Sequence, residues 1–162
     1  MSPDTYGEAG QTPLHVAADA GNLETATLLL DAGANPAAGW DQHATEPLHL
    51  AIFNRDIDIM TLLLDRGAPL DEGPGGRSPL HIACAFGGPE AIQLLLDRGG
   101  DLELVGSYGQ GPALGVAVHN RQPEAVRLLL DRGADASMTV PISTFYIGGP
   151  DRATLLYVAM DL

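Results

Sequence analysis

The chain contains no lysine, and its 162 residues carry a formal net charge of −13. All 8 basic residues are arginines, against 21 aspartates and glutamates. Binding to nucleic acid or to an anionic membrane needs clustered Lys and Arg to neutralise phosphates, so we expect neither as a partner. A protein partner with a basic patch would be attracted by the negative field.

The absence of lysine has three interpretations that the sequence leaves open. The chain is rich in Ala, Gly, Asp and Arg, which is typical of proteins encoded by high-GC bacterial genomes. A secreted effector without lysine would escape lysine modification inside a eukaryotic host. A salt-rich cytoplasm is the third interpretation, because aspartate outnumbers glutamate two to one.

Cysteine is nearly absent as well, and the single Cys84 excludes an internal disulfide. It suits a reducing compartment, and we expect it to be a small core residue. No apolar run approaches the roughly 18 residues of a membrane-spanning helix. The N-terminus lacks the basic and then apolar pattern of a signal peptide. We therefore expect a cytoplasmic protein, or one found in a host cell if the chain is a secreted effector.

The chain does contain a repeat. The ending Leu-Leu-Leu-Asp-Xaa-Gly occurs at residues 28–33, 62–67, 94–99 and 128–133, and its glycines lie 34, 32 and 34 residues apart. A period near 33 residues predicts stacked units, each too small to bury its apolar face alone.

A second motif precedes each ending at the same spacing. It reads Thr-Pro-Leu-His at 12–15, Glu-Pro-Leu-His at 46–49, Ser-Pro-Leu-His at 78–81 and a degraded Pro-Ala-Leu-Gly at 112–115. With both motifs in phase, the chain resembles the ankyrin-repeat family. The resemblance implies a single all-α domain, 1–162: an ankyrin-repeat solenoid of helix-turn-helix units with short β-hairpin fingers. Its repeats are expected at about 7–39, 40–72, 73–105 and 106–137, followed by an irregular insertion at 138–152 and a partial fifth repeat at 153–162.

The residue types at the helix ends agree with this fold. Thr12 and Ser78 can cap helices, and the prolines that follow suit the first helical position. Glu46 is a poorer cap and Pro112 has no capping side chain, so repeat four should begin less tightly. The closing glycines suit a left-handed backbone after each second helix. Between the repeats, Asp and Arg rows predict a solvated ladder with occasional ion pairs.

The histidines invite a metal site, but their spacing argues against one. His15, His49 and His81 recur once per repeat, and stacked helices lie about 8–10 Å apart. Zinc needs ligand atoms only about 3–4 Å apart. The resemblance implies that these histidines bond backbone groups and order the fingers. We find no catalytic motif and expect no enzyme, cofactor or metal; a ligand or metal site on His43 and His119 is a minor alternative.

The residues that differ between repeats are the candidate binding site. The resemblance implies a concave groove formed by the fingers and the first helices. The candidate partner-binding residues are Trp40, Gln42, His43, Phe53, Asn54, Arg77, Ala85, Phe86, Tyr108, His119 and Asn120. Aromatic residues are only 5% of the chain yet gather here, and large rigid side chains dominate binding hot spots. We expect an acidic groove centred on repeats two and three. Packing of Trp40 on Phe53 to stiffen a finger is the alternative.

The C-terminal end breaks the pattern. Residues 138–150 are strand-like and then rich in glycine, which indicates an extended finger or a capping loop. We expect a last helix over 153–162 that is apolar on all sides and uncovered. Either the chain was cut from a longer array, or this end folds back or docks on another molecule, so self-association is a further expectation.

Taken together, these features predict a non-enzymatic protein–protein interaction module, a scaffold or adaptor that binds through its groove and fingers. The alternative is a targeting or regulatory ankyrin segment of a larger enzyme or of a secreted bacterial effector.

Overall fold

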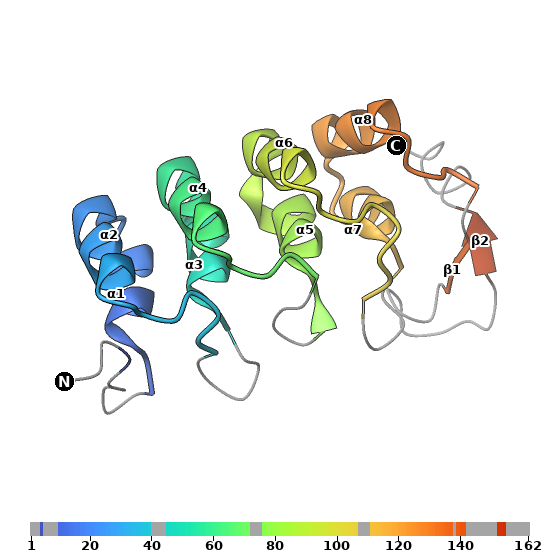
Figure 1. Cartoon of the computed structure of the whole chain (residues 1–162). Helices are drawn as coiled ribbons and strands as arrows, with labels where there is room; N and C mark the ends of the chain where they lie inside the picture. The colour runs from blue at the N-terminus through green and yellow to red at the C-terminus, as the bar shows by residue number, and fades with distance from the viewer. Residues whose placement is uncertain are drawn as a thin grey trace.

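Four helix-turn-helix units lie side by side in a computed structural model that describes residue 4 and residues 10–39, 45–71, 76–106, 111–137, 139–141 and 152–154. The pairs are α1 (Pro13–Asp19) with α2 (Leu23–Asp31), α3 (Pro47–Asn54) with α4 (Ile57–Asp65), α5 (Pro79–Ile82) with α6 (Pro89–Asp97), and α7 (Ala113–His119) with α8 (Pro123–Asp131). The odd-numbered helices form one layer and the even-numbered helices the other (Figure 1). The predicted all-helical repeat solenoid is confirmed.

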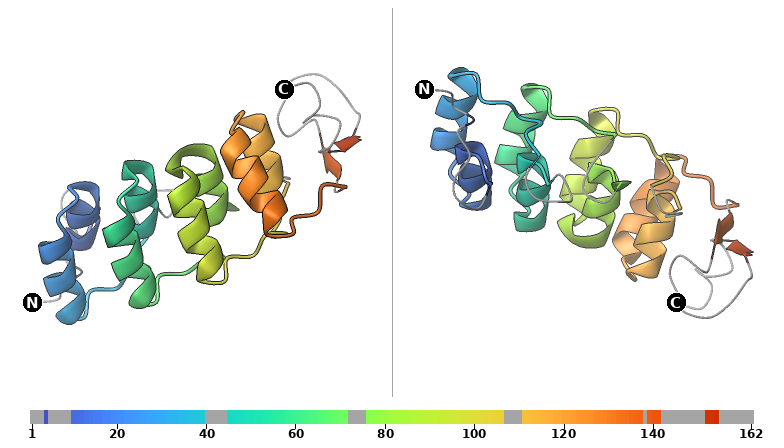
Figure 2. Two further views of the ribbon diagram at one scale, coloured as in Figure 1. Left: turned by 90° about the horizontal axis from the view of Figure 1, so that it is seen from above. Right: turned by 90° about the horizontal axis from the view of Figure 1, so that it is seen from below.

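The stack is extended, and each unit packs on its sequence neighbours. Figure 2 shows the four pairs following one another in chain order, with no unit folding back on an earlier one. Contacts run between successive first helices, such as α1 and α3, and between successive second helices, such as α4 and α6. In the described part of the chain, no helix has the length and apolar character needed to cross a membrane.

The helix ends use the predicted residues. The backbone N–H of His15 donates to Thr12 Oγ1, and that of His81 donates to Ser78 Oγ, both at 3.4 Å. Pro112 supplies no side-chain cap to α7. The glycines after the second helices have φ angles of 87° to 92°, in the region that a side chain disfavours. The sequence therefore determines where these helices begin and end.

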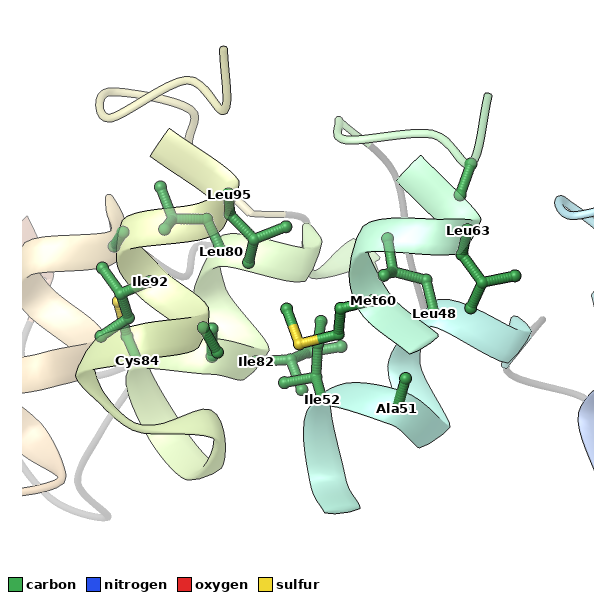
Figure 3. Close-up of a cluster of buried hydrophobic side chains, with 14 of the residues drawn as sticks. Leu48, Ala51, Ile52, Met60, Leu63, Leu80, Ile82, Cys84, Ile92 and Leu95 are labelled. Atoms are coloured by element: carbon green, nitrogen blue, oxygen red, sulfur yellow. The ribbon is translucent and has the colours of Figure 1, made fainter. Parts of the chain in front are cut away.

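The core is a row of equivalent leucines shared between units. The first-helix leucines Leu14, Leu48, Leu80 and Leu114 are at most 2% exposed. Figure 3 shows Ile52 and Met60 of the second repeat pointing toward Ile82 of the third, so adjacent units share one apolar layer. Cys84 is buried within it, and burial raises the pKa of its thiol to about 12. Its predicted role as a core residue is confirmed.

Two features differ from the expectation. After α5 the chain continues as a π-helical turn over Ala83–Gly87, which the repeat pattern did not predict. At the C-terminal end, β1 (Thr139–Pro141) pairs antiparallel with β2 (Arg152–Thr154), opposing Val140 to Ala153. The helix expected from 153 is thus wrong at its start, because the backbone there satisfies its hydrogen bonds as a strand. Residues 155–162 lie outside the described part.

Candidate functional site

The described candidate residues of the first helices lie at the C-terminal end of the first helix in each of three successive repeats. Phe53 and Asn54 end α3, Ala85 and Phe86 lie in the π-helical turn, and His119 with Asn120 end α7. We call this set, with Asp19 at the end of α1, the first-helix surface. Its members are exposed, except that Ala85 is half-buried against the core. Trp40, Gln42, His43 and Tyr108 lie outside the described residues.

Phe53 and Phe86 form a pair across two repeats. Their ring centroids lie 5.3 Å apart with the planes tilted by 49°, which is a favourable aromatic geometry. Each side chain remains 47% exposed. The first-helix surface therefore presents two aromatic rings that hold each other in position while half of each stays in water.

The π-helical turn brings Phe86 close to the second repeat. A Cβ built on Gly87 would lie 2.9 Å from Ile52 Cγ2, closer than Cβ atoms pack in proteins, and 3.1 Å from Ala91 Cβ, which is a tight contact. Glycine at this position thus permits the close approach of the two repeats. A π-helical turn re-aims side chains relative to an α-helix and is frequent at functional sites. The pair Gly87-Gly88 is the feature of the sequence that could have indicated this turn.

The asparagines of the candidate set are committed to the scaffold. Asn54 Nδ2 donates to the carbonyl of Asp19 at 2.8 Å, which links α3 to α1. Asn120 Nδ2 donates to the carbonyl of Val116 at 2.8 Å, within its own helix end. Since these amides already use a donor internally, the positions contribute shape more than hydrogen bonds to a partner.

Two arginines that the sequence reading did not select adjoin this surface. Arg55 and Arg121 follow α3 and α7 with φ angles of 58° and 54°, where the first repeat has Gly21. A side chain in this left-handed conformation costs about 1 kcal/mol or more, so arginine is an unfavourable choice for the backbone alone. Arg55 Nε donates to the carbonyl of Phe86 at 3.0 Å. Arginine in place of the helix-end glycine was the signal that could have found them.

Acidic residues concentrate on the opposite layer. Each second helix has one acidic residue in its first turn and an aspartate at its end. The end aspartates Asp31, Asp65 and Asp97 pair with Arg66, Arg98 and Arg132 of the following repeat at 2.7–2.9 Å. The predicted inter-repeat ladder is confirmed. The acidic groove that we expected stays a prediction, because finger residues that would form part of it lie outside the described residues.

The repeated histidines serve the scaffold. The backbone N–H of Thr12 donates to His15 Nδ1, so His15 Nε2 carries the proton and donates to the Thr45 carbonyl at 2.9 Å. His81 Nε2 likewise reaches the Gly111 carbonyl at 3.1 Å. Burial lowers the pKa of His81, and Arg77, exposed one residue before the Ser78 cap, lowers it further. The implied hydrogen bond from histidine to a backbone group is confirmed at these two positions, and in both cases the bond reaches the next repeat.

His49 differs from His15 and His81 at its Nε2 atom. Its Nδ1 accepts from the backbone N–H of Glu46 at 3.0 Å, but its Nε2 is buried and has no hydrogen-bond partner among the residues that the structure describes. Burial, followed by repulsion from His15, lowers its pKa to about 4. The spacing from the second repeat to the third is two residues shorter than the other spacings, so the connecting segment differs here. Within the described ranges, no three His, Cys, Asp or Glu side chains are grouped to hold a metal ion.

Stacked helix pairs with an exposed surface at the ends of their first helices define a helical-repeat protein of the kind that binds other proteins. The family model described as ankyrin repeats (3 copies) matches residues 2–73 and 68–140, and the chain belongs to the ankyrin-repeat family. Ankyrin repeats are generally protein–protein interaction modules. A comparison with curated proteins gives no match.

Proposed function

We propose that this chain is a non-enzymatic protein-binding module, a scaffold or adaptor, whose binding site is the first-helix surface centred on repeats two and three. The observation that carries the proposal is the exposed ring pair of Phe53 and Phe86. Arg77, His119 and the finger residues Trp40, Gln42, His43 and Tyr108 would extend the contact on either side.

The energetics of the pair favour a binding role. With 47% of each side chain exposed, a partner that covers both rings removes roughly 180 Å² of apolar surface, worth about 4 kcal/mol. This matches the scale of an interface hot spot. The rings are already held by each other, so little side-chain entropy is lost when the partner binds.

The acidic second helices would act at longer range. They contribute to the negative field of the molecule, which attracts a partner with a basic patch and raises the association rate at low salt. We propose steering by this field and anchoring by the aromatic pair as separate contributions. The association rate should then fall with added salt, whereas the dissociation rate should depend on Phe53 and Phe86.

An affinity pull-down from the native cell lysate tests the proposal. The wild type is compared with a Phe53→Ala/Phe86→Ala variant, with a Trp40→Ala/Phe86→Ala variant and with Leu28→Ala as a matched control. Leu28 is 63% exposed in α2, away from the first-helix surface. The same partner should be retained by the wild type and by Leu28→Ala, and lost from both aromatic variants. Equal retention by all four proteins would refute the site.

Self-association through residues 155–162 stays a prediction, because these residues lie outside the described part of the chain. Light scattering during gel filtration tests it. A molar mass that rises with protein concentration would support it, and a strictly monomeric protein would contradict it.

A further inference from the structure

The arginine that adjoins the aromatic pair is fixed in place without a carboxylate. Arg55 Nε donates to the backbone carbonyl of Phe86, which holds the guanidinium at the backbone of a residue of the ring pair. The ion pairs found among the described residues join second helices, and none involves Arg55. Its two Nη groups have no hydrogen-bond or ion-pair partner in the described part of the chain.

The backbone conformation of Arg55 is a second indication that its side chain has a function. Its φ of 58° and ψ of 32° lie in the left-handed region, where glycine is favoured and where the first repeat has Gly21. A non-glycine residue held in a disfavoured conformation points to a function for its side chain. Arg121, in the same conformation after α7, serves as a natural comparison.

The local charge also runs against that of the whole chain. The net charge is −13, yet the cation that borders the ring pair is unpaired. Glu90 is a neighbour, since a Cβ built on Gly88 would lie 3.7 Å from Glu90 Oε2 and 3.9 Å from Arg55 Nη1, but these two side chains form no ion pair. An arginine with free Nη donors is well suited to grip a carboxylate with two parallel hydrogen bonds.

We propose that the first-helix surface binds a protein segment in which an apolar side chain is followed or preceded closely by a carboxylate. The apolar side chain covers Phe53 and Phe86, and the carboxylate binds the Arg55 guanidinium. The two anchors are adjacent, and an extended chain advances about 3.3 Å per residue, so the carboxylate belongs within roughly three residues of the apolar side chain. This inference rests on the proposed function and names the chemistry of its partner.

A selection from a random peptide library displayed on phage tests the proposal with the full chain as bait. The wild type should enrich peptides that carry Asp or Glu within about three residues of an aromatic residue or leucine. Arg55→Gly suits the left-handed backbone, so it should keep or raise the melting temperature while losing this acidic enrichment. Arg121→Gly makes the same change two repeats away and should retain the enrichment.

Resynthesised peptides give the quantitative test, in which the key carboxylate is replaced by its amide. On the wild type, fluorescence polarisation should show at least about a tenfold loss of affinity, as expected for a charge-assisted hydrogen bond. On Arg55→Gly, the carboxylate and amide peptides should bind alike. Acidic peptides that lose the same affinity on both proteins would overturn the assignment to Arg55.

The outcomes separate this inference from the proposed function. Peptides that require Phe53 and Phe86 but show no carboxylate preference, or that prefer Lys and Arg, overturn the inference and leave the binding surface intact. Peptides that bind the Phe53→Ala/Phe86→Ala variant as well as the wild type count against both. Recovery of no binding peptide also overturns the inference.

Discussion

Replacing His49 should make the stability of this protein less sensitive to acid. The ring is buried and its pKa is lowered from 6.5 to about 4, first by burial and then by His15. Between these two pH values the unfolded chain binds a proton at this residue and the folded chain does not. The stability that the protein gains from keeping His49 neutral is therefore complete above pH 6.5. The free energy of unfolding falls as the pH falls from 6.5 toward 4.

The size of the effect follows from the two pKa values. Going from pH 7 to pH 5, His49 alone should remove about 2 kcal/mol from the free energy of unfolding, and about 3 kcal/mol by pH 4. This is a large fraction of the stability of a small domain. In His49→Gln the amide oxygen can still accept from the Glu46 N–H, while the titrating group is gone.

Urea unfolding followed by circular dichroism measures the effect at pH 9, 7, 6 and 5 for both proteins. The wild type should lose about 2 kcal/mol more than His49→Gln between pH 7 and pH 5. Between pH 7 and pH 9 the two curves should run parallel, because His49 stays neutral in both states. Equal losses between pH 7 and pH 5 would refute the buried, neutral state of this ring.

Three further predictions concern the scaffold. Gly87→Ala should lower the free energy of unfolding by about 2 kcal/mol, because the new Cβ would clash with Ile52 of the neighbouring repeat. A melting temperature that rises in thermal denaturation would contradict the close approach of the two repeats. A double-mutant cycle on Asp65 and Arg98 should give a coupling energy of about 0.5 kcal/mol that weakens in salt, because the aspartate side chain is 59% exposed. A coupling energy above about 1.5 kcal/mol would contradict a solvent-exposed ion pair. In urea unfolding, Leu63→Ala should lower the free energy of unfolding by about 3 kcal/mol, because Leu63 is fully buried. Leu28→Ala should lower it by less than about 0.5 kcal/mol, because Leu28 is exposed, and equal losses would contradict this difference in burial.

The scaffold could be predicted because its determinants are local and repeated. The structural role of each repeated residue depends only on the turn or helix in which it lies. This holds for the helix-end glycines, for the first-helix leucines, and for the capping residues Thr12 and Ser78. Four copies in phase make the interpretation secure, and His15 and His81 form the implied bonds. Even the ladder of Asp and Arg followed from the register of the repeat.

The site was predicted only in part, because it depends on geometry between repeats. Phe53 and Phe86 occupy different positions in their repeats, and they meet because the π-helical turn and Gly87 bring the units together. Arg55 was overlooked, since its importance lies in a left-handed backbone that no spacing displays. The helix expected over 153–162 begins as a strand at 153–154, because the sequence does not reveal that this segment pairs with Thr139–Pro141.

The central claim is that a protein partner binds the aromatic pair at the ends of the first helices of repeats two and three. Its most direct test is the affinity of a captured partner for the wild type and for Phe53→Ala/Phe86→Ala, measured by calorimetry together with the melting temperature of each protein. We predict a loss of about 100-fold or more in affinity with a stability change below about 1 kcal/mol. An unchanged affinity, or a loss that unfolding of the variant explains, would contradict the claim.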